Sequence, residues 1–164
     1  MKQLYLIRHA KSSWEHNDLH DHDRPLNKRG LQDAPEMGNR LKSLGITPSA
    51  LITSTANRAL STAKAIAAQI KYPSEEIILD SNLYHSSEDE ILEIVHQIDN
   101  KYDSAMLFGH NPGFTWFANE LGSLNIDNIP TCGIVGFNLD AKSWQEINWG
   151  NGKLLFFDYP KNKH

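Results

Sequence analysis

The sequence predicts an α/β fold, a three-layer α/β/α sandwich with a mixed, mostly parallel central sheet. Along the first 121 residues, short apolar, β-prone runs alternate with longer stretches in which apolar residues recur at helical spacing. This βαβα order is typical of a parallel sheet with helices on both faces. From residue 134 onwards the runs are strand-like, and the turn at 150–152 is typical of a hairpin, so antiparallel strands should extend the sheet.

Length, charge and cysteine content limit the classes of protein to consider. The 164 residues suffice for a single domain, 1–164, with a substantial core. The net charge is −4 with both signs interspersed, which argues against nucleic-acid or anionic-membrane binding. The first strand is short and ends in Arg8, unlike a secretion signal or a membrane span, so we expect a cytoplasmic protein. A monomer is the simplest expectation for this length, and the single cysteine, Cys132, should be buried rather than reactive.

The expected strands are short and are separated by polar or glycine-containing segments. A long polar loop, 11–23, follows the first strand. Large aromatic residues are usually buried, so Trp116, Trp144 and Trp149 are expected in the core and Trp14 outside it. The last two expected strands should form a hairpin across 150–152. The strands are 3–8, 50–53, 77–79, 104–108, 134–139, 144–149 and 153–157.

The helices expected in the first half follow these strands and carry N-cap residues. Asn27 caps the first, and Pro35 should kink this helix or mark its true first turn. Ser54 or Thr55 caps the second, which ends near Ile70. The apolar residues expected on one face of the first helix are Leu31, Ala34, Met37, Leu41 and Leu44.

Two more helices are expected in the second half. An acidic amphipathic helix over 88–98 places Ile91, Leu92, Val95 and Ile98 inward. The next helix begins with Asn111 as its N-cap and Pro112 at its first position.

Three of the expected strands end in a cation or an imidazole. Arg8 and His9 end the first strand, Arg58 follows the strand 50–53, and His110 follows the strand 104–108. Ligands of open α/β sheets bind at the carboxyl ends of the strands, so these side chains converge if the three strands are neighbours. Two guanidinium groups and two helix N-termini would then bind a phosphoryl group. His9, kept neutral by the flanking arginines, would be the nucleophile.

The motifs around these residues resemble those of a known family. The segment Arg8-His9-Ala10-Lys11-Ser12-Ser13-Trp14 resembles the Arg-His-Gly motif of the histidine phosphatase superfamily, which includes the cofactor-dependent phosphoglycerate mutases. With Asp23-Arg24-Pro25-Leu26-Asn27-Lys28-Arg29-Gly30, Arg58-Ala59 and Gly109-His110-Asn111-Pro112, the likeness is greatest to the SixA-type phosphohistidine phosphatases. It extends over about residues 2–115.

The resemblance implies a role for each matched residue. His9 would carry the phosphoryl group, and Arg8, Arg58 and His110 would line the phosphate pocket. Ser12 matches a hydroxyl that binds phosphate in relatives. Arg24 matches an arginine near the same pocket, although a salt bridge that pins the long loop explains it equally well. The implied activity is a phosphoric monoester or phosphoramidate hydrolase that acts through a phosphohistidine enzyme intermediate on protein phosphohistidine, without a cofactor.

The sequence departs from the family at the third motif residue, Ala10 instead of Gly, and at the general acid. The places where relatives carry a carboxylate hold His85 and Asn111. An alkoxide is a poor leaving group and needs a proton from an acid, whereas the nitrogen of a phosphorylated imidazole is easily protonated and leaves as neutral imidazole, so a missing acid fits a phosphoramidate. If His85 donates the proton, the substrate is instead a small phosphate ester. A phosphate-binding module without catalysis is a further alternative. The expected partner is a phosphorylated protein or a small phosphate compound.

The loop 11–23 carries several side chains that can bind metals. They lie close together in one segment without regular ligand spacing, so we expect no metal site and a loop that gates the pocket. The side chains are those of His16, Asp18, His20, Asp21, His22 and Asp23.

Overall fold

In residues 1–163, which a computed structural model describes, the sheet has six strands in the order β3-β2-β4-β1-β5-β6. The first four strands run parallel, whereas β5 and β6 are antiparallel to their neighbours. The predicted mixed, mostly parallel sheet is therefore confirmed. The strands are β1 (Lys2–Arg8), β2 (Ala50–Thr53), β3 (Ile78–Leu79), β4 (Ser104–Gly109), β5 (Ile134–Leu139) and β6 (Gly152–Asp158).

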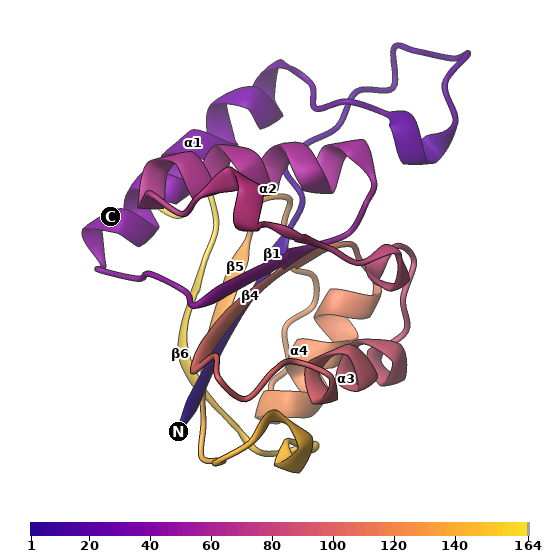
Figure 1. The fold of residues 1–164 in the computed structure, drawn as a ribbon. Coiled ribbons are helices and arrows are strands. Elements are labelled where there is room, and N and C mark those ends of the chain that lie inside the picture. The colour runs from indigo at the N-terminus through magenta and orange to yellow at the C-terminus, as the bar shows by residue number, and fades with distance from the viewer. Residues whose placement is uncertain (164) are drawn as a thin grey trace.

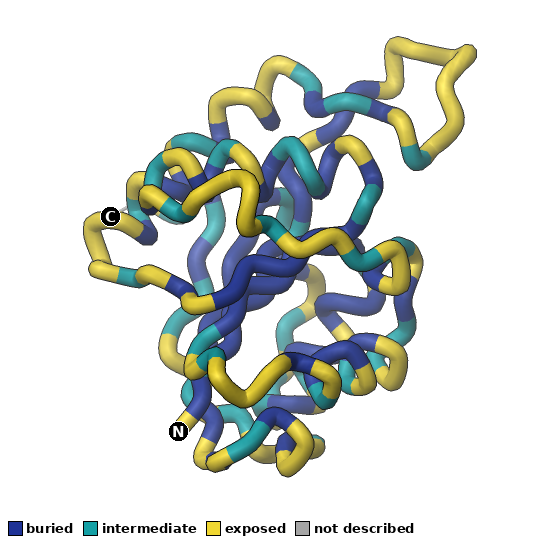
Figure 2. The backbone as a smooth tube through the Cα atoms, in the orientation of Figure 1, coloured by how far each residue is buried: buried dark blue, intermediate teal, exposed yellow. Residues whose placement is uncertain are grey.

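Four α-helices of the described chain cover the two faces of this sheet (Figure 1). Along β1, Leu4 and Leu6 point into one core, with α3 and α4, and Tyr5 and Ile7 point into the other, with α1 and α2. Figure 2 shows the buried strands lying between the helices. The three layers agree with the prediction. The helices are α1 (Lys28–Ser43), α2 (Asn57–Ile70), α3 (Glu88–His96) and α4 (Gly113–Gly122).

Helix α1 begins where the sequence predicts, since the Asn27 side chain accepts a hydrogen bond from the Gly30 amide. The helix continues through Pro35 to Ser43 as one element. Two of its predicted inward residues, Leu31 and Leu44, are exposed, so the predicted face was too wide. Leu31 lies about 90° around the helix from the centre of the buried stripe, and Leu44 is the C-cap, past the last helical residue.

The predicted caps of α2 and α4 were wrong by one or two residues. Ala56 is the N-cap of α2, and Ser54 instead accepts a hydrogen bond from the Ala56 amide at 3.2 Å. Pro112 is the N-cap of α4, and the Asn111–Pro112 peptide bond is cis. The Asn111 side chain accepts a hydrogen bond from the Thr115 amide at 3.3 Å, so it still pairs with an amide in the first turn of the helix.

The predicted strand 144–149 was wrong. Trp144–Glu146 forms a short 3₁₀-helix, and β6 pairs with β5 rather than with this segment. Trp144 is fully buried, and its indole nitrogen donates to the Tyr102 carbonyl at 2.8 Å, so side-chain packing determines the local conformation.

The burial of the other tryptophans differs in part from the prediction. Trp116 was expected in the core but is 51% exposed on α4. Trp149 is partly buried against Phe117, and Trp14 is exposed as expected. None of the helices in residues 1–163 combines the length and the apolar character needed to cross a membrane.

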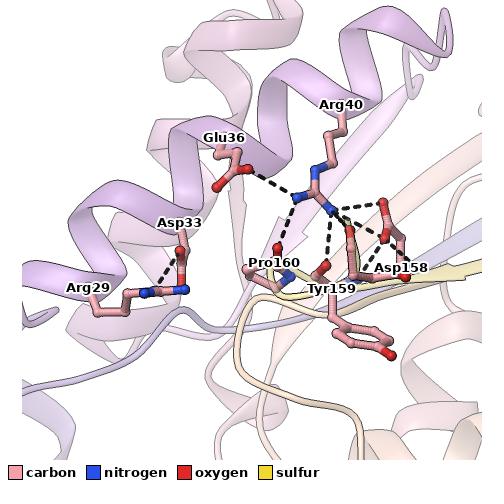
Figure 3. Close-up of polar contacts among 8 residues, drawn as sticks. Arg29, Asp33, Glu36, Arg40, Asp158, Tyr159 and Pro160 are labelled. Atoms are coloured by element: carbon pink, nitrogen blue, oxygen red, sulfur yellow. Dashed lines mark hydrogen bonds and ion pairs between the residues drawn. The ribbon is translucent and has the colours of Figure 1, made fainter. Parts of the chain in front are cut away.

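Arg40 of α1 fastens the segment that follows β6 (Figure 3). Its guanidinium group also pairs with Glu36 at 3.0 Å, one helical turn earlier. Both carboxylate oxygens of Asp158 lie 3.3 Å from the same group. The further acceptors are the carbonyl oxygens of Tyr159, Pro160 and Asn162, at 2.9, 2.9 and 3.0 Å.

Candidate active site

The sheet places the ends of β1, β2 and β4 side by side, as the sequence analysis required. Arg8 is opposite Gly109 in the parallel pair β1–β4, and β2 is the other neighbour of β4. The His9 amide donates to the Gly109 carbonyl at 3.0 Å, and the centroids of the His9 and His110 rings are 5.2 Å apart. The two predicted histidines therefore meet at the carboxyl edge of the sheet.

His9 is buried and has one defined tautomer. Its Nδ1 lies 2.7 Å from the carbonyl oxygen of Ala10. A carbonyl only accepts hydrogen bonds, so Nδ1 carries the proton and Nε2 keeps its lone pair. Burial, together with the positive charges of Arg58 and Arg8, lowers the pKa of His9 to about 4. At neutral pH the ring is thus an uncharged base with a free lone pair, which is what nucleophilic attack requires.

The alanine that replaces the family glycine fits this turn. Ala10 is fully buried, and its amide donates to the Thr62 hydroxyl of α2 at 2.9 Å. Thr62 also donates to the Arg58 carbonyl at 2.7 Å. The residue after His9 is therefore fastened to the helix that carries Arg58.

The positive charges of three arginines, Arg8, Arg24 and Arg58, act on His9 and lower its pKa. Each has a buried N–H group without a hydrogen-bond partner among the described residues: Nε of Arg8, Nη1 of Arg24 and Nε of Arg58. Burying unpaired donors is unfavourable unless a ligand accepts from them. Unpaired guanidinium N–H groups are the kind of donor that binds an oxyanion.

Arg24 and Ser12 lie together beside this site. Nη2 of Arg24 donates to the Ser12 hydroxyl at 2.8 Å, and both side chains are buried. Arg24 also forms the loop salt bridge that the sequence analysis left open, because its Nε is 3.3 Å from Asp21. Trp14 covers Arg24, with its ring centroid 3.4 Å from the guanidinium carbon.

Asp21 is a site residue that the sequence analysis placed only in the gating loop. Its carboxylate accepts from Arg58 at 3.0 Å and from the Tyr84 hydroxyl at 2.5 Å, and its carbonyl accepts from Arg58 at 2.7 Å. Burial raises the pKa of Asp21, but the hydrogen bonds from Tyr84 and Arg58 outweigh it and lower the pKa to about 2. Asp21 is therefore ionised at neutral pH. Its position three residues before Arg24 was the one signal in the sequence.

His85 lies at the mouth of the site. Its side chain is 60% exposed, and its Nε2 is 3.5 Å from the Asp21 carboxylate. Its ring packs against Tyr84 and is 6.0 Å from the His110 ring, centroid to centroid. Asn111 holds the other position that relatives use for an acid. Its side-chain nitrogen donates to the Ile129 carbonyl, and its side-chain oxygen accepts from the Thr115 hydroxyl.

His110 is buried between His9 and Tyr84. Burial and the charges of His9 and Arg58 lower its pKa to about 2. Its Nε2 lies 2.8 Å from the Ser54 hydroxyl, and its Nδ1 is buried without a partner among the described residues. Ser54 is a contact that the sequence analysis missed, because it gave that residue only a helix cap.

The loop 11–23 contains no assembled metal site. Within residues 1–163, no group of three or more histidine, cysteine, aspartate or glutamate side chains is arranged to hold a metal ion. Cys132 is fully buried as expected, and burial raises the pKa of its thiol. Its amide donates to the carbonyl groups of Arg8 and His9, so its contribution here is to the backbone behind the site.

Comparison with known proteins assigns this arrangement to a family. Residues 4–111, which include every candidate site residue, match the family model of the histidine phosphatase superfamily (branch 1). The chain belongs to the histidine phosphatase superfamily. An uncharacterized chloroplastic protein of Arabidopsis thaliana is 33% identical over 153 residues, which cover 88% of this chain and 70% of the relative. Membership supports a phosphatase activity.

Solved structures of this superfamily have the same fold. The protein histidine phosphatase SixA, solved with tungstate, has a TM-score of 0.82 at 21% identity and covers 98% of both chains. A mycobacterial glucosyl-3-phosphoglycerate phosphatase, solved with VO3, has a TM-score of 0.71 at 12% identity and covers 97% of this chain and 100% of its own. At these identities the likeness is one of fold.

Proposed function

We propose that this chain is a phosphohistidine phosphatase that transfers the phosphoryl group from a histidine-phosphorylated protein, through His9, to water. The observation that carries the proposal is the combination of an uncharged His9 with unpaired arginine donors around it. Arg8, Arg24 and Arg58 would hold the phosphoryl oxygens, and Ser12 would support Arg24. His110 would contribute a hydrogen bond to the same group.

The reaction would have two steps. The His9 Nε2 lone pair attacks phosphorus while the P–N bond of the substrate breaks, and the departing imidazole, protonated by solvent on its other nitrogen, leaves uncharged. Water then attacks phosphorus, the P–Nε2 bond breaks, and its electron pair returns to His9. The proton of the water passes to the phosphate product. The arginine charges stabilise the oxygens in both transition states.

The proton supply at the site supports the proposed substrate class. Asp21 is the carboxylate in contact with the arginines, and at a pKa of about 2 it has no proton to donate at neutral pH. The alkoxide of an alkyl phosphate needs such a proton from the site in order to leave, whereas a phosphorylated imidazole takes its proton from solvent on its other ring nitrogen and leaves as neutral imidazole. The site is therefore better suited to phosphohistidine than to a phosphate ester.

The test is phosphate release from a histidine-phosphorylated protein and from alkyl and aryl phosphates. The matched variant is His9→Asn, whose amide nitrogen can replace Nδ1 as donor to Ala10 but which has no nucleophilic Nε2. We expect preference for phosphohistidine in the wild type and loss of both turnover and an acid-labile phosphoenzyme in the variant. Turnover that persists in His9→Asn would contradict the proposal, and oxyanion binding without any turnover would favour a binding module.

A small-ester phosphatase is the second candidate, and the position of His85 at the mouth of the site favours it. In that case the wild type would release phosphate from alkyl phosphates as fast as from phosphohistidine. His85→Gln would then lower alkyl phosphate turnover and leave aryl phosphates, which have better leaving groups, largely unchanged.

A further inference from the structure

We infer that Ser54 is a positioning residue that fixes the tautomer of His110, so that Nδ1–H becomes a hydrogen-bond donor to the bound phosphoryl group. Among the described residues Ser54 forms no hydrogen bond with His9 or with the arginine donors. The inference rests on the proposed function only in placing His110 in the phosphate site. It assigns a role to a residue that neither the motifs nor the charges of the site single out.

The hydrogen bonds of the Ser54 hydroxyl determine which of two atoms, Oγ of Ser54 or Nε2 of His110, donates the hydrogen bond between them. Its oxygen accepts from the Ala56 amide at 3.2 Å and lies 2.8 Å from Nε2 of His110. Ser54 is fully buried, and among residues 1–163 no other acceptor lies within hydrogen-bond distance of its hydroxyl. The hydroxyl proton therefore points to His110, which makes Nε2 the acceptor.

The uncharged His110 ring then carries its proton on Nδ1. The pKa of His110 is about 2, so the ring does not gain a second proton near neutral pH. Nδ1 points away from Ser54, since the two ring nitrogens diverge, and it is buried without a partner among the described residues. A buried N–H without an acceptor is the same arrangement that Arg8 and Arg58 show around His9.

The opposite tautomer would be unfavourable for the proposed reaction. With the proton on Nε2, the Nδ1 lone pair would face the oxygens of a phosphoryl group and repel them. The ring sits 5.2 Å from His9, centroid to centroid, so the donor or the lone pair would act at the reacting group. The Ser54 hydroxyl therefore selects the form of His110 that binds the oxyanion.

Two variants test this role. Ser54→Ala removes the hydroxyl that donates to Nε2, whereas Ser54→Thr keeps it. Thr53→Val is the matched control, because Thr53 is an equally buried hydroxyl one residue away that donates to the Ser54 carbonyl at 3.0 Å and, among the described residues, forms no hydrogen bond with His110. The readouts are the ¹⁵N chemical shifts of the His110 ring, which distinguish the two tautomers, and calorimetric affinity for tungstate.

We expect the Nδ1–H tautomer in the wild type, a mixture in Ser54→Ala, and about 10- to 100-fold weaker tungstate binding in that variant, the loss of one hydrogen bond to a charged group. Ser54→Thr should restore both readouts, and Thr53→Val should leave both unchanged. A wild-type His110 protonated on Nε2 would overturn the inference without any variant. Folded Ser54→Ala with unchanged tautomer and affinity would also overturn it.

These readouts need no turnover. If the protein fails to release phosphate from any substrate but the tautomer and the tungstate affinity respond to Ser54→Ala, the proposed function is wrong and the inference stands. If phosphohistidine is hydrolysed and Ser54→Ala alters neither readout nor the rate, the inference is wrong and the proposed function stands.

Discussion

Acid should destabilise this protein through His9, and His9→Asn should remove that sensitivity. Burial and the charges of Arg58 and Arg8 lower the pKa of His9 from 6.5 to about 4 in the folded chain. Between these pH values the unfolded chain binds a proton at residue 9 that the folded chain does not. The free energy of unfolding therefore falls as the pH is lowered through this range and is unaffected by His9 above it.

The size of the effect follows from the same pKa values. From pH 6.5 to pH 5 the difference in proton binding amounts to about 2 kcal/mol, at about 1.36 kcal/mol per pH unit. We expect the wild type to lose about 2 kcal/mol more than His9→Asn between pH 7 and pH 5. Urea unfolding at both pH values, followed by the fluorescence of the buried Trp144, measures this difference.

His20→Gln is the control for this experiment, because His20 is exposed in the loop before α1. Its loss of stability between pH 7 and pH 5 should equal that of the wild type. If His9→Asn loses as much stability as the wild type, His9 takes up a proton as readily in the folded chain as in the unfolded one. The argument for an uncharged nucleophile would then fail.

Three other predictions concern the loop, the turn after His9 and the C-terminal segment. Asp21→Asn should bind tungstate about threefold to tenfold more tightly by calorimetry, because it removes a negative charge next to Arg58, and unchanged affinity would contradict this. Gly30→Ala should lower the free energy of unfolding by about 1–3 kcal/mol in urea, since the added Cβ would lie 2.2 Å from the Lys11 carbonyl oxygen. Arg40→Met should lower it by about 2 kcal/mol and expose the C-terminal segment to carboxypeptidase, and a digestion rate equal to that of the wild type would argue against this role.

The candidate residues that the structure brings together as predicted lie at the ends of strands. Arg8, His9 and His110 continue apolar runs, and parallel neighbouring strands bring their ends to one edge without further information. Arg58 was predicted because it lies in the first turn of α2, the helix that follows β2. Hydrophobic periodicity and one topological rule therefore sufficed to predict that these candidate residues lie close together.

The residues that it missed depend on contacts between distant segments. Asp21 and Tyr84 are 63 positions apart and meet only because a loop folds back over α2, and Ser54 meets His110 across 56 positions. No local pattern encodes such a pair. Trp144 shows the same effect in the fold, since its β-prone neighbours form no strand once its ring is buried and bonded to Tyr102.

The feature of the site that would favour the proposed catalysis also lowers the stability of the folded protein. The site leaves N–H groups of Arg8, Arg24, Arg58 and His110 buried without partners among the described residues, and it keeps two imidazoles uncharged by desolvation. Each unpaired donor costs free energy in the empty protein, and an oxyanion recovers that cost when it binds. In the proposed reaction the attack of His9 on phosphorus would take place beside donors that the fold already holds in position, which is how a preorganised site lowers a barrier.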